Sequence, residues 1–591
     1  MKTRIWLWFG IILTAALAAG MISCGGGGGG GNGGLTFAEP AYFVSVDDLA
    51  ASDANPGSMD LPFATIQAAV DAAAVAHTLA RVYVAEGTYL VSYQAGTHVV
   101  LPDGIEIFGG YSADWSERDP SVFTSTITDT STTGGSDPNN SNRAVDCSVA
   151  LSAPTIDGFT INGGAGTAST GVYIYNAGPT LSRNTISGGS GTTYATGVYV
   201  GDSVPIINLN IISGGTGPLT TTGIYVELNS APLITLNIID GGSGDYARGI
   251  YQSSSWSVTP IEMNTITGGT GNAQLSIAIN NATNSTSYIA SNTIHGGSGQ
   301  NTQGIQNFRT GMVSIFDNFI SGGVAVNTAR GINNDSSGAP ATIANNVVYA
   351  GSSFNTFGIS SIATSLLTIE RNVIHGGRST AGSYALDESG TSNDVRNNLI
   401  HGGEGGTVRA LRFYNSGTLI RNNTISAGDG TLVYGLQVAA EAGSPTPVVE
   451  NNLFMNPASS SGYGIFESTA DGDPISVRNN VIDGFGFDAY YDLDGGCGMA
   501  GDADPDTCTA DEVNSLGDMT VSSNTAAVPL LEDVDGPDDD LSTMEDNLWS
   551  PSASSPGALT SGGLDLSSDF TDDYTGTTRT APWSIGAYEY D

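Results

Sequence analysis

A short motif, close to N-x-I-x-G-G, recurs along most of the chain and constrains its fold more than any other feature. It begins twelve times at intervals of 25 to 29 residues, and a degenerate copy, F-T-I-N-G-G, begins at Phe159. The twelve copies start at Asn184, Asn210, Asn237, Asn264, Asn292, Asn318, Asn346, Asn372, Asn398, Asn423, Asn452 and Asn480. Repeats of this length indicate a solenoid or a propeller.

Each repeat contains three short strand-like pieces. In the first complete repeat these are G-V-Y-I from Gly171, P-T-L-S from Pro179 and T-I-S from Thr185. No helical pattern lies between them, unlike in a leucine-rich repeat, and a propeller blade needs about 40 residues and longer strands. The spacing therefore predicts an all-β chain in which each repeat is one three-stranded coil of a parallel β-helix.

The composition of the repeat suits stacked coils. Inward Val, Ile and Leu of one coil would stack on those of the next and form one continuous core. The Asn lies at the corner between the second and third strands, where stacked side chains can hydrogen-bond along the axis. The two Gly permit positive φ where the chain turns into its loop. At about 4.8 Å per coil, twelve coils would span about 58 Å.

The asparagine corner and the coil plan resemble the pectate-lyase-like right-handed β-helices. The resemblance covers roughly Ala144 to Tyr490 and implies a right-handed β-helix of about 13 to 15 coils over residues 144–490. It implies no particular activity, because such helices include lyases, hydrolases, adhesins and inert scaffolds.

Both open ends of the solenoid need caps. Apolar residues at helical spacing predict a short helix over Phe63–Ala76, within an N-terminal cap and first coils at 37–143. Residues 491–591 are expected to form an irregular, acidic C-terminal cap. Three stretches of it, D-V-D-G-P-D-D-D from Asp533, S-P-S-A-S-S-P-G from Ser550 and the terminal I-G-A-Y-E-Y, resemble the choice-of-anchor Q module of bacterial surface proteins, although A-L-T-S-G replaces the usual A-I-D-A-G.

The first residues have the pattern of a secretory leader. Two basic residues precede an apolar run from Ile5 to Ala19, which is too short to prefer a membrane span. The sequence M-I-S-C ends at Cys24 and resembles the bacterial lipobox, although Met21 stands in place of the usual Leu. The resemblance implies a signal peptide over 1–23 and lipidation of Cys24; the alternative is a cut that leaves a free cysteine.

A glycine-rich stretch follows the cysteine. Residues 24–36 would behave as a flexible tether for a domain outside the cytoplasm. Gly25, rather than Asp, follows Cys24, so the common retention signal for the inner membrane is missing. We expect a lipid anchor in the outer membrane, with the β-helix exposed at the cell surface.

The large negative net charge excludes some classes of binding partner. The chain has 58 acidic and 17 basic residues, with a formal net charge of −41. Such a charge repels nucleic acid and anionic membrane surfaces, so neither is expected as a partner, and it suits divalent cations. Cys497 and Cys508 lie in a Gly/Asp-rich segment and are expected to form a disulfide, which leaves Cys147 as a small buried residue.

The outer face of the first strand is where pectate-lyase-like enzymes hold sugars. Alternation places Val172 and Ile174 inside and Tyr173 outside. The same position holds four tyrosines and then continues along the repeats, as Tyr173, Tyr199, Tyr225, Tyr251, Ala278, Gln306, Asn333, Ser360, Asp387, Arg412, Gln437 and Phe466. An exposed tyrosine stripe could bind a glycan by ring stacking, or it could only stabilise the solenoid.

Catalysis has less support on this face. Glycoside hydrolysis needs two nearby carboxyl groups, and no two outward carboxylates adjoin here. Asp387 lies beside Arg412, and both are ligand-binding candidates. His295, His375 and His401 each precede the Gly-Gly pair and are expected in solvated turns. The sequence favours a surface scaffold or adhesin that binds a glycan; the alternative is a polysaccharide lyase or glycoside hydrolase.

Two acidic segments are candidates for calcium, because alternating carboxylates are common calcium ligands. Neither has the Glu that completes an EF-hand, and both could equally be solvated acidic turns. The candidate ligands are Asp502, Asp504, Asp506, Asp533, Asp535 and Asp538.

Overall fold

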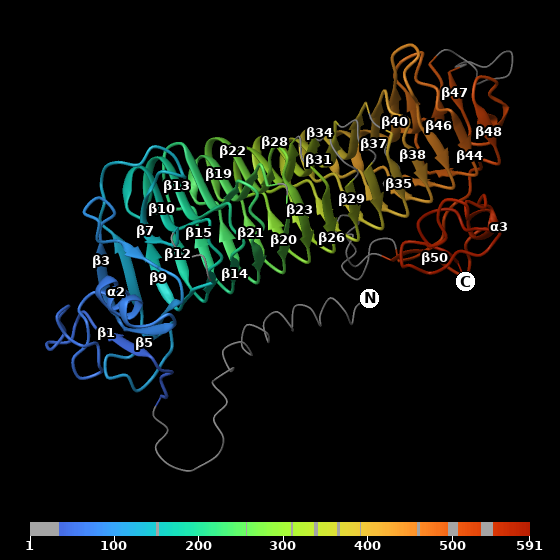
Figure 1. The fold of residues 1–591 in the computed structure, drawn as a ribbon. Coiled ribbons are helices and arrows are strands. Elements are labelled where there is room, and N and C mark those ends of the chain that lie inside the picture. The colour runs from blue at the N-terminus through green and yellow to red at the C-terminus, as the bar shows by residue number, and fades with distance from the viewer. Residues whose placement is uncertain are drawn as a thin grey trace.

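The protein is a long parallel β-solenoid of about 15 coils (Figure 1). Each repeat passes through three sheets, called here sheets 1, 2 and 3 in the order in which the chain visits them. The computed structural model describes residues 35–148, 153–255, 257–308, 311–335, 341–362, 367–390, 392–457, 461–493, 506–533 and 548–590.

Sheet 1 contains the longest strands of the repeats and has 16 strands. Its neighbours pair in parallel, apart from the last pair. The strands are β4 Val99–Val100, β7 Asn142–Asp146, β10 Ala165–Tyr175, β13 Ser190–Gly201, β16 Thr220–Glu227, β19 Ser243–Ser253, β22 Thr270–Asn281, β25 Ser298–Phe308, β28 Val324–Asp335, β31 Ser352–Ser361, β34 Arg378–Ser389, β37 Glu404–Tyr414, β40 Asp429–Ala439, β43 Gly462–Glu467, β46 Asp488–Tyr491 and β47 Thr507–Cys508.

Sheet 2 has 17 strands, most of them three to five residues long. They are β1 Ala41–Val44, β2 Ala80–Ala85, β5 Ile105–Tyr111, β8 Thr155–Asp157, β11 Thr180–Ser182, β14 Ile206–Asn208, β17 Leu233–Thr235, β20 Val258–Glu262, β23 Thr286–Ala290, β26 Val313–Phe316, β29 Ala341–Ala344, β32 Leu367–Glu370, β35 Asp394–Arg396, β38 Leu419–Arg421, β41 Val448–Glu450, β44 Ser476–Arg478 and β48 Thr520–Ser522.

Sheet 3 has 15 strands, and those within the repeats are three residues long. They are β3 Gly87–Val91, β6 Ser125–Asp129, β9 Phe159–Asn162, β12 Thr185–Ser187, β15 Ile211–Ser213, β18 Ile238–Asp240, β21 Thr265–Thr267, β24 Thr293–His295, β27 Phe319–Ser321, β30 Val347–Tyr349, β33 Val373–His375, β36 Leu399–His401, β39 Thr424–Ser426, β42 Leu453–Met455 and β45 Val481–Asp483.

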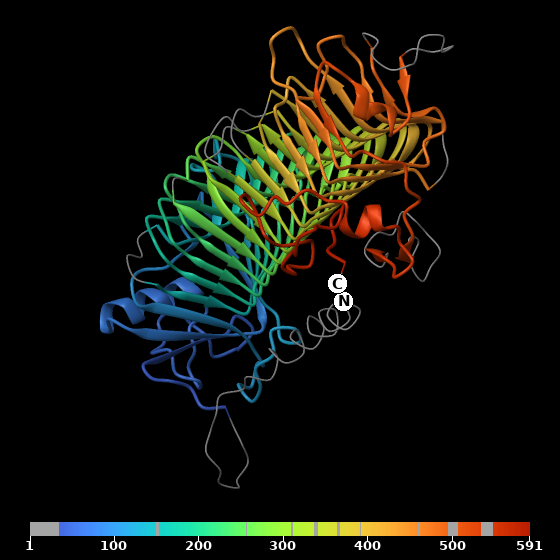
Figure 2. The ribbon, with the colours of Figure 1, turned by 90° about the vertical axis from the view of Figure 1, so that its right-hand side faces the viewer.

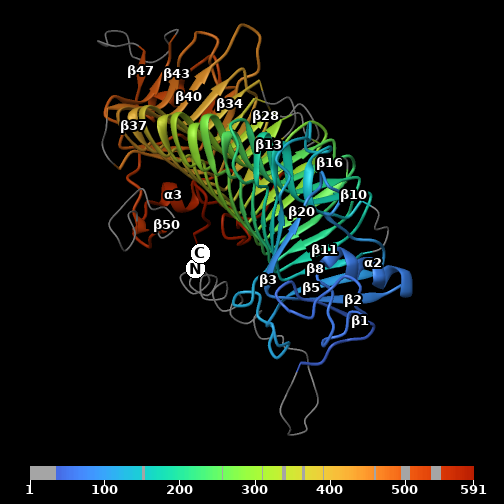
Figure 3. The same ribbon diagram turned by 90° about the vertical axis from the view of Figure 1, so that its left-hand side faces the viewer.

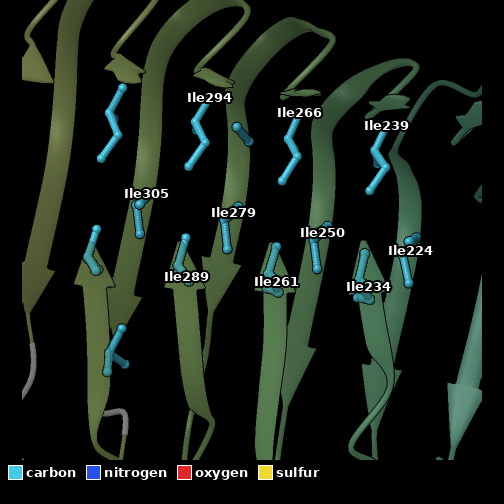
Figure 4. Close-up of a cluster of buried hydrophobic side chains, with 14 of the residues drawn as sticks. Ile224, Ile234, Ile239, Ile250, Ile261, Ile266, Ile279, Ile289, Ile294 and Ile305 are labelled. Carbon is cyan, nitrogen blue, oxygen red and sulfur yellow. The ribbon is translucent and has the colours of Figure 1, made fainter. Parts of the chain in front are cut away.

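The core is a set of aliphatic columns parallel to the solenoid axis (Figure 4). One coil contributes Ile234 from sheet 2, Ile239 from sheet 3 and Ile250 from the following strand of sheet 1, all fully buried. The next coil places Ile261, Ile266 and Ile279 in the same register. These columns belong to one cluster of buried residues that runs from Val44 to Leu516, so the predicted continuous core is confirmed.

The asparagine of each repeat occupies the corner between sheets 2 and 3, as predicted. Asn318 is typical: its backbone N–H and its Nδ2 donate to Oδ1 of Asn346 at 2.9 and 3.0 Å. Its Nδ2 also donates to the carbonyls of Ile289 and Phe316. The ladder runs one residue further than the motif, because Asn480 donates to Asn524 in the same way.

The N-terminal end is covered by the predicted helix (Figure 3). The helix, α2, spans Ile66–Ala76 and begins at the N-cap Thr65, whose side chain accepts from the N–H of Ala68. Ile66 and Val70 lie in the core cluster of the first coils. No helix in the described ranges is long and apolar enough to cross a membrane.

The C-terminal region has two parts. Residues 506–525 close the last coil, with η2 (Glu512–Ser515) and β48, and place Val513 and Leu516 in the core. Residues 548–590, the C-terminal module, instead turn back along the solenoid (Figure 2). This module contains β50 (Leu548–Pro551), paired with β49 (Leu531–Asp533), and α3 (Gly557–Ser561).

The C-terminal module covers the outer side of sheet 3 in the later coils. Trp549, Leu559 and Ile585 pack there against Val373 and Leu399. The residue before each ladder asparagine has positive φ, and in four of these coils its side-chain amide donates to a backbone carbonyl of the module; these residues are Asn397, Asn422, Asn451 and Asn479. The sequence did not predict this return along the solenoid.

Candidate functional site

The candidate site is the outer face of sheet 1, where two columns of side chains meet. Tyr173, Tyr199, Tyr225 and Tyr251 form the tyrosine column, and adjacent strands pair these residues in register. A second column, three residues earlier in the strand, contains Arg248, Arg330 and Arg409 and is called the arginine column. The two columns touch: the guanidinium of Arg248 lies 4.8 Å from the ring centroid of Tyr251.

The tyrosine column stacks as predicted, but two of its rings are buried and the other two, Tyr225 and Tyr251, are half-buried. Adjacent ring centroids are 4.8, 5.7 and 4.9 Å apart from Tyr173 to Tyr251. Tyr173 is only 5% exposed and Tyr199 is fully buried. The predicted exposure of this stripe is therefore wrong for these two rings, because each packs against its neighbours instead of facing solvent.

The polar groups of the tyrosine column are also satisfied by the protein. The hydroxyl of Tyr173 donates to Asn139 at 2.7 Å, and that of Tyr199 donates to Glu227. Arg143 lies 3.8 Å from the centroid of Tyr173 and closes one end of the stack. Burial raises the pKa of the Tyr173 and Tyr199 hydroxyls. These features give the buried part of the stack a structural role.

The predicted continuation of this register needs one correction. Asn280, not Ala278, pairs with Tyr251, because the strands are out of step between Gly244 and Tyr246. The sequence interval alone could not show this irregularity. From Gln306 onward the predicted register is correct.

Asp387 and Arg412 are neighbours on this face, as predicted. The guanidinium donates to both carboxylate oxygens, at 2.6 and 2.8 Å, and both side chains are half-buried. The same guanidinium lies 4.4 Å from the ring centroid of Tyr384. Tyr384 in turn stacks on Phe357, with centroids 4.7 Å apart and planes within 5°. Unlike Tyr199, both rings are half-buried and reach the surface.

The arginine column contains the feature that sequence reasoning missed. Arg248, Arg330 and Arg409 have no carboxylate partner among the described residues. Every other arginine in the described ranges lies within 3.5 Å of a carboxylate oxygen. In a chain with so large an acidic excess, the absence of a partner at three positions of one column singles out this face.

The three arginines are evenly spaced and flanked by aromatic rings. Three coil steps separate Arg248 from Arg330, and three more separate Arg330 from Arg409. Arg330 lies 4.9 Å from the centroid of Phe357, and Arg409 lies between Tyr384 and Tyr434. The buried Nε of Arg248 and that of Arg330 have no hydrogen-bond partner in the described structure. Desolvation lowers the pKa of both guanidinium groups, so an arriving anion would be favoured at these positions.

The three histidines are the last residues of β24, β33 and β36, not turn residues, and two of them are not solvated. His375 and His401 are each 3% exposed and stack with centroids 4.7 Å apart. Their Nδ1 atoms accept the N–H of Gly377 and Gly403, respectively. The expected solvated turn is therefore wrong for this pair, and for His295 only the expected exposure to solvent is confirmed.

The proposed calcium ligands lie mostly outside the described residues, which include only Asp506 and Asp533 of the six. Asp502, Asp504, Asp535 and Asp538 cannot be placed. Near Asp506 the structure shows another set of carboxylates: ligand oxygens of Glu467, Asp473 and Asp492 all lie within 4.8 Å of one another. These groups could hold a divalent cation. Burial, with its two acidic neighbours, raises the pKa of Glu467 to about 8.

The cysteines are tested only in part. Cys147 is buried and free, as expected. Cys508 is also buried, but Cys497 lies outside the described residues, so their disulfide stays a prediction. Cys24, the predicted lipidation site, is likewise outside the described residues.

Two family matches agree with this architecture. The family described as "Protein of unknown function (DUF1565)" matches residues 49–254, and the family described as "Right handed beta helix region" matches residues 330–502. The fold and these matches define the chain as a right-handed parallel β-helix protein. No curated protein matches it in sequence.

Several solved β-helix structures show a distant likeness. The mannuronan C-5 epimerase AlgE6 A-module of Azotobacter vinelandii is 15% identical, with 82% of this chain and 100% of that chain covered and a TM-score of 0.24. PfbA, a surface adhesin of Streptococcus pneumoniae, is 12% identical, with coverages of 73% and 94% and a TM-score of 0.33. Pectate lyase Pel9A is 12% identical, with coverages of 93% and 96% and a TM-score of 0.24. Similarity this low says nothing about the activity of the chain.

Proposed function

We propose that this protein binds an acidic glycan along the outer face of sheet 1, with Arg248, Arg330 and Arg409 holding carboxylate or sulfate groups. The observation that carries the proposal is that none of the described carboxylates forms an ion pair with these three arginines. A guanidinium forms its strongest contacts as a bidentate donor to a planar or tetrahedral anion. An even spacing of such donors along a straight face suits a ligand with repeated negative charges.

The rings beside the arginines favour a sugar chain over other anions. Phe357 and Tyr384 stack on each other but are only half-buried, so the exposed edges of their rings can contact the apolar face of a pyranose. The net charge of −41 opposes a polyanion as dense as nucleic acid. A glycan with spaced acidic groups meets less repulsion. This role replaces the tyrosine stripe as the binding surface, and it keeps Asp387 and Arg412 beside the ligand.

Display outside the cytoplasm is part of the same proposal. The leader and Cys24 support a lipid anchor in the outer membrane, and the resemblance of the C-terminal region to the choice-of-anchor Q module supports a surface protein. A Cys24→Ser variant should be released from the membrane fraction into the medium. Unchanged fractionation would contradict the anchor without affecting the proposal for sheet 1.

A matched pair of ligands tests glycan binding. Polyuronates and their carboxyl-reduced, neutral counterparts share a backbone and differ only in charge. The proposal predicts saturable binding of the acidic polymer that weakens with salt, and little binding of the reduced polymer. Equal binding of both polymers, or of neither, would contradict it. New reducing ends or unsaturated products in the same samples would assign the alternative function, a glycoside hydrolase or a polysaccharide lyase.

A further inference from the structure

A groove follows the corner between sheets 3 and 1, at the first residues of the sheet 1 strands, whereas the arginine column lies in the middle of these strands. Its volume is about 580 Å³, within the range of small-molecule sites. One wall is formed by His295, Phe319, Tyr349 and His375, and the other by the first residues of β28, β31, β34 and β37. The groove therefore crosses several consecutive coils.

The floor of the groove is bare backbone. It consists of the second glycine of successive repeats, each with a φ of +80° to +95°. At Gly323 a Cβ atom would lie 2.3 Å from the carbonyl oxygen of Gly297, so no side chain can fill this space. The column of glycines lets a ligand approach the main chain closely.

The ring wall departs from the chemistry of the other repeats. In earlier coils the last residue of the sheet 3 strand is Ser, Thr or Asp, and its oxygen accepts the N–H of the second glycine. His375 makes the same contact through Nδ1, at 2.8 Å from the Gly377 nitrogen. A serine would suffice for this turn, so the imidazole is not required by the fold.

The tautomer of His375 leaves a donor at the groove. Because Nδ1 accepts a hydrogen bond, the proton of the neutral imidazole is on Nε2. Burial, with the nearby His401 and Arg378, lowers the pKa of His375 well below its usual value, so the ring is neutral near pH 7. His375 is 3% exposed, and its buried Nε2 has no hydrogen-bond partner in the described structure.

The charges at the groove cancel each other. Arg378 and Glu404 form an exposed ion pair, with Nε and Oε1 3.1 Å apart. The remaining wall residues, apart from the neutral histidines, are Phe319, Val324, Tyr349 and hydroxyl groups, and Phe319 is 38% exposed. Apolar rings beside polar donors and acceptors, without net charge, suit an uncharged ligand that has both apolar faces and hydroxyls.

We propose that this groove binds a short neutral oligosaccharide, with a pyranose on Phe319 and Tyr349 and, after a rotation of the ring that exposes the buried Nε2 of His375, a sugar hydroxyl accepting from this atom. The site is separate from the acidic-glycan site and does not depend on it. The ion pair of Arg378 and Glu404 would then bind hydroxyls at the end of the groove.

The five histidines of the chain provide a direct readout. The full chain, labelled at histidine, is titrated with short cello-, malto- and chito-oligosaccharides, and imidazole NMR signals are followed. We expect saturable shifts of the His295 and His375 signals, with those of His77 and His98 unchanged. Phe319→Ala should abolish the shifts. Phe354→Ala is the matched control, because Phe354 is also exposed but does not line the groove, and it should retain them.

Three results would overturn the proposal. The first is that no sugar of the three series shifts the groove histidines, and the second is that Phe319→Ala still responds like the unaltered protein. The third is that an uncharged peptide, but no sugar, gives saturable shifts, which would assign the groove to a polypeptide. Arg330→Gln should leave the shifts intact, so failure of the acidic-glycan proposal and failure of this one can be told apart.

Discussion

The asparagine corner and the outer face of sheet 1 belong to the same coils but follow opposite rules. At the corner one residue type recurs coil after coil. Both polar atoms of the Asn318 side chain, Oδ1 and Nδ2, have hydrogen-bond partners in the protein. On sheet 1 the residue changes from coil to coil, and Arg330 has no carboxylate partner among the described residues. Columns of one residue type whose polar groups are all hydrogen-bonded stabilise the solenoid. Positions where the residue type changes and a charged group has no ion-pair partner are candidates for a binding surface.

The tyrosine column lies between these two cases. It recurs over four coils like the corner, yet it lies on the same face as the arginines. Its hydroxyls and ring faces are largely satisfied within the protein, so we assign it to the structural class. The following predictions test that division, from the largest expected effect to the smallest.

Removing a buried tyrosine ring should have the largest effect on stability. Tyr199→Ala deletes a fully buried ring between Tyr173 and Tyr225 and should lower the free energy of unfolding by about 3–5 kcal/mol. Chemical denaturation measures the loss, with Phe354→Ala as the exposed aromatic control. A stable Tyr199→Ala protein that has lost glycan binding would restore the tyrosine column as the binding surface.

Breaking the asparagine ladder should cost less. Asn318→Ala removes the oxygen to which the backbone N–H and the Nδ2 of Asn292 donate. The loss of this acceptor should lower the free energy of unfolding by about 1–3 kcal/mol. Asn333→Ala, on the outer face of sheet 1, is the control and should change it by less than about 0.5 kcal/mol. Similar losses in the two variants would remove the distinction between corner and face.

The buried carboxylates near the last coil should give an effect that is small at each step of pH, because it is spread over several pH units. The pKa of Glu467 is about 8 in the folded protein and near 4.5 when unfolded, so the folded state holds the proton more tightly. Stability should therefore fall as pH rises from about 4.5 to about 8, by at most about 1.4 kcal/mol per pH unit, and level off above that. Glu467→Gln should flatten this slope.

Adding calcium tests whether this carboxylate cluster is a metal site or only a group of buried acids. If Glu467, Asp473 and Asp492 bind the ion, calcium should raise the melting temperature of the unaltered protein near pH 8 and should not raise that of Glu467→Gln. An equal response of both proteins to calcium would exclude this cluster as the site. The predicted ligands around Asp502 and Asp533 would then be tested by the same titration.

The coil plan could be predicted from the sequence because it depends on local, repeated chemistry. Each Asn, inward Ile and Gly has the same neighbours in every coil, so one repeat describes the others. Irregular positions could not be predicted in this way. The shift in register between β19 and β22 pairs Tyr251 with Asn280, but it does not change the spacing of the asparagine motifs beyond its usual range. The return of the C-terminal module over Val373 and Leu399 depends on contacts between residues far apart in sequence.

The candidate site was only partly predictable for the same reason. The ion pair of Asp387 and Arg412 follows from the register alone. The burial of Tyr199 depends on neighbouring coils and on Glu227, and the missing partners of Arg248 and Arg330 depend on where every nearby acid lies in space. One signal was available in the sequence: the arginines recur in one register position, three coils apart.

Isothermal titration with a polyuronate is the most direct test of the arginine column. The double variant Arg330→Gln/Arg409→Gln should bind at least about tenfold more weakly than the unaltered protein, because each lost charged contact is worth about 1.5–3 kcal/mol. Arg183→Gln is the control, since Arg183 is paired with Asp157 away from this face, and it should bind normally. Affinity unchanged in the double variant, with its melting temperature preserved, would contradict the account.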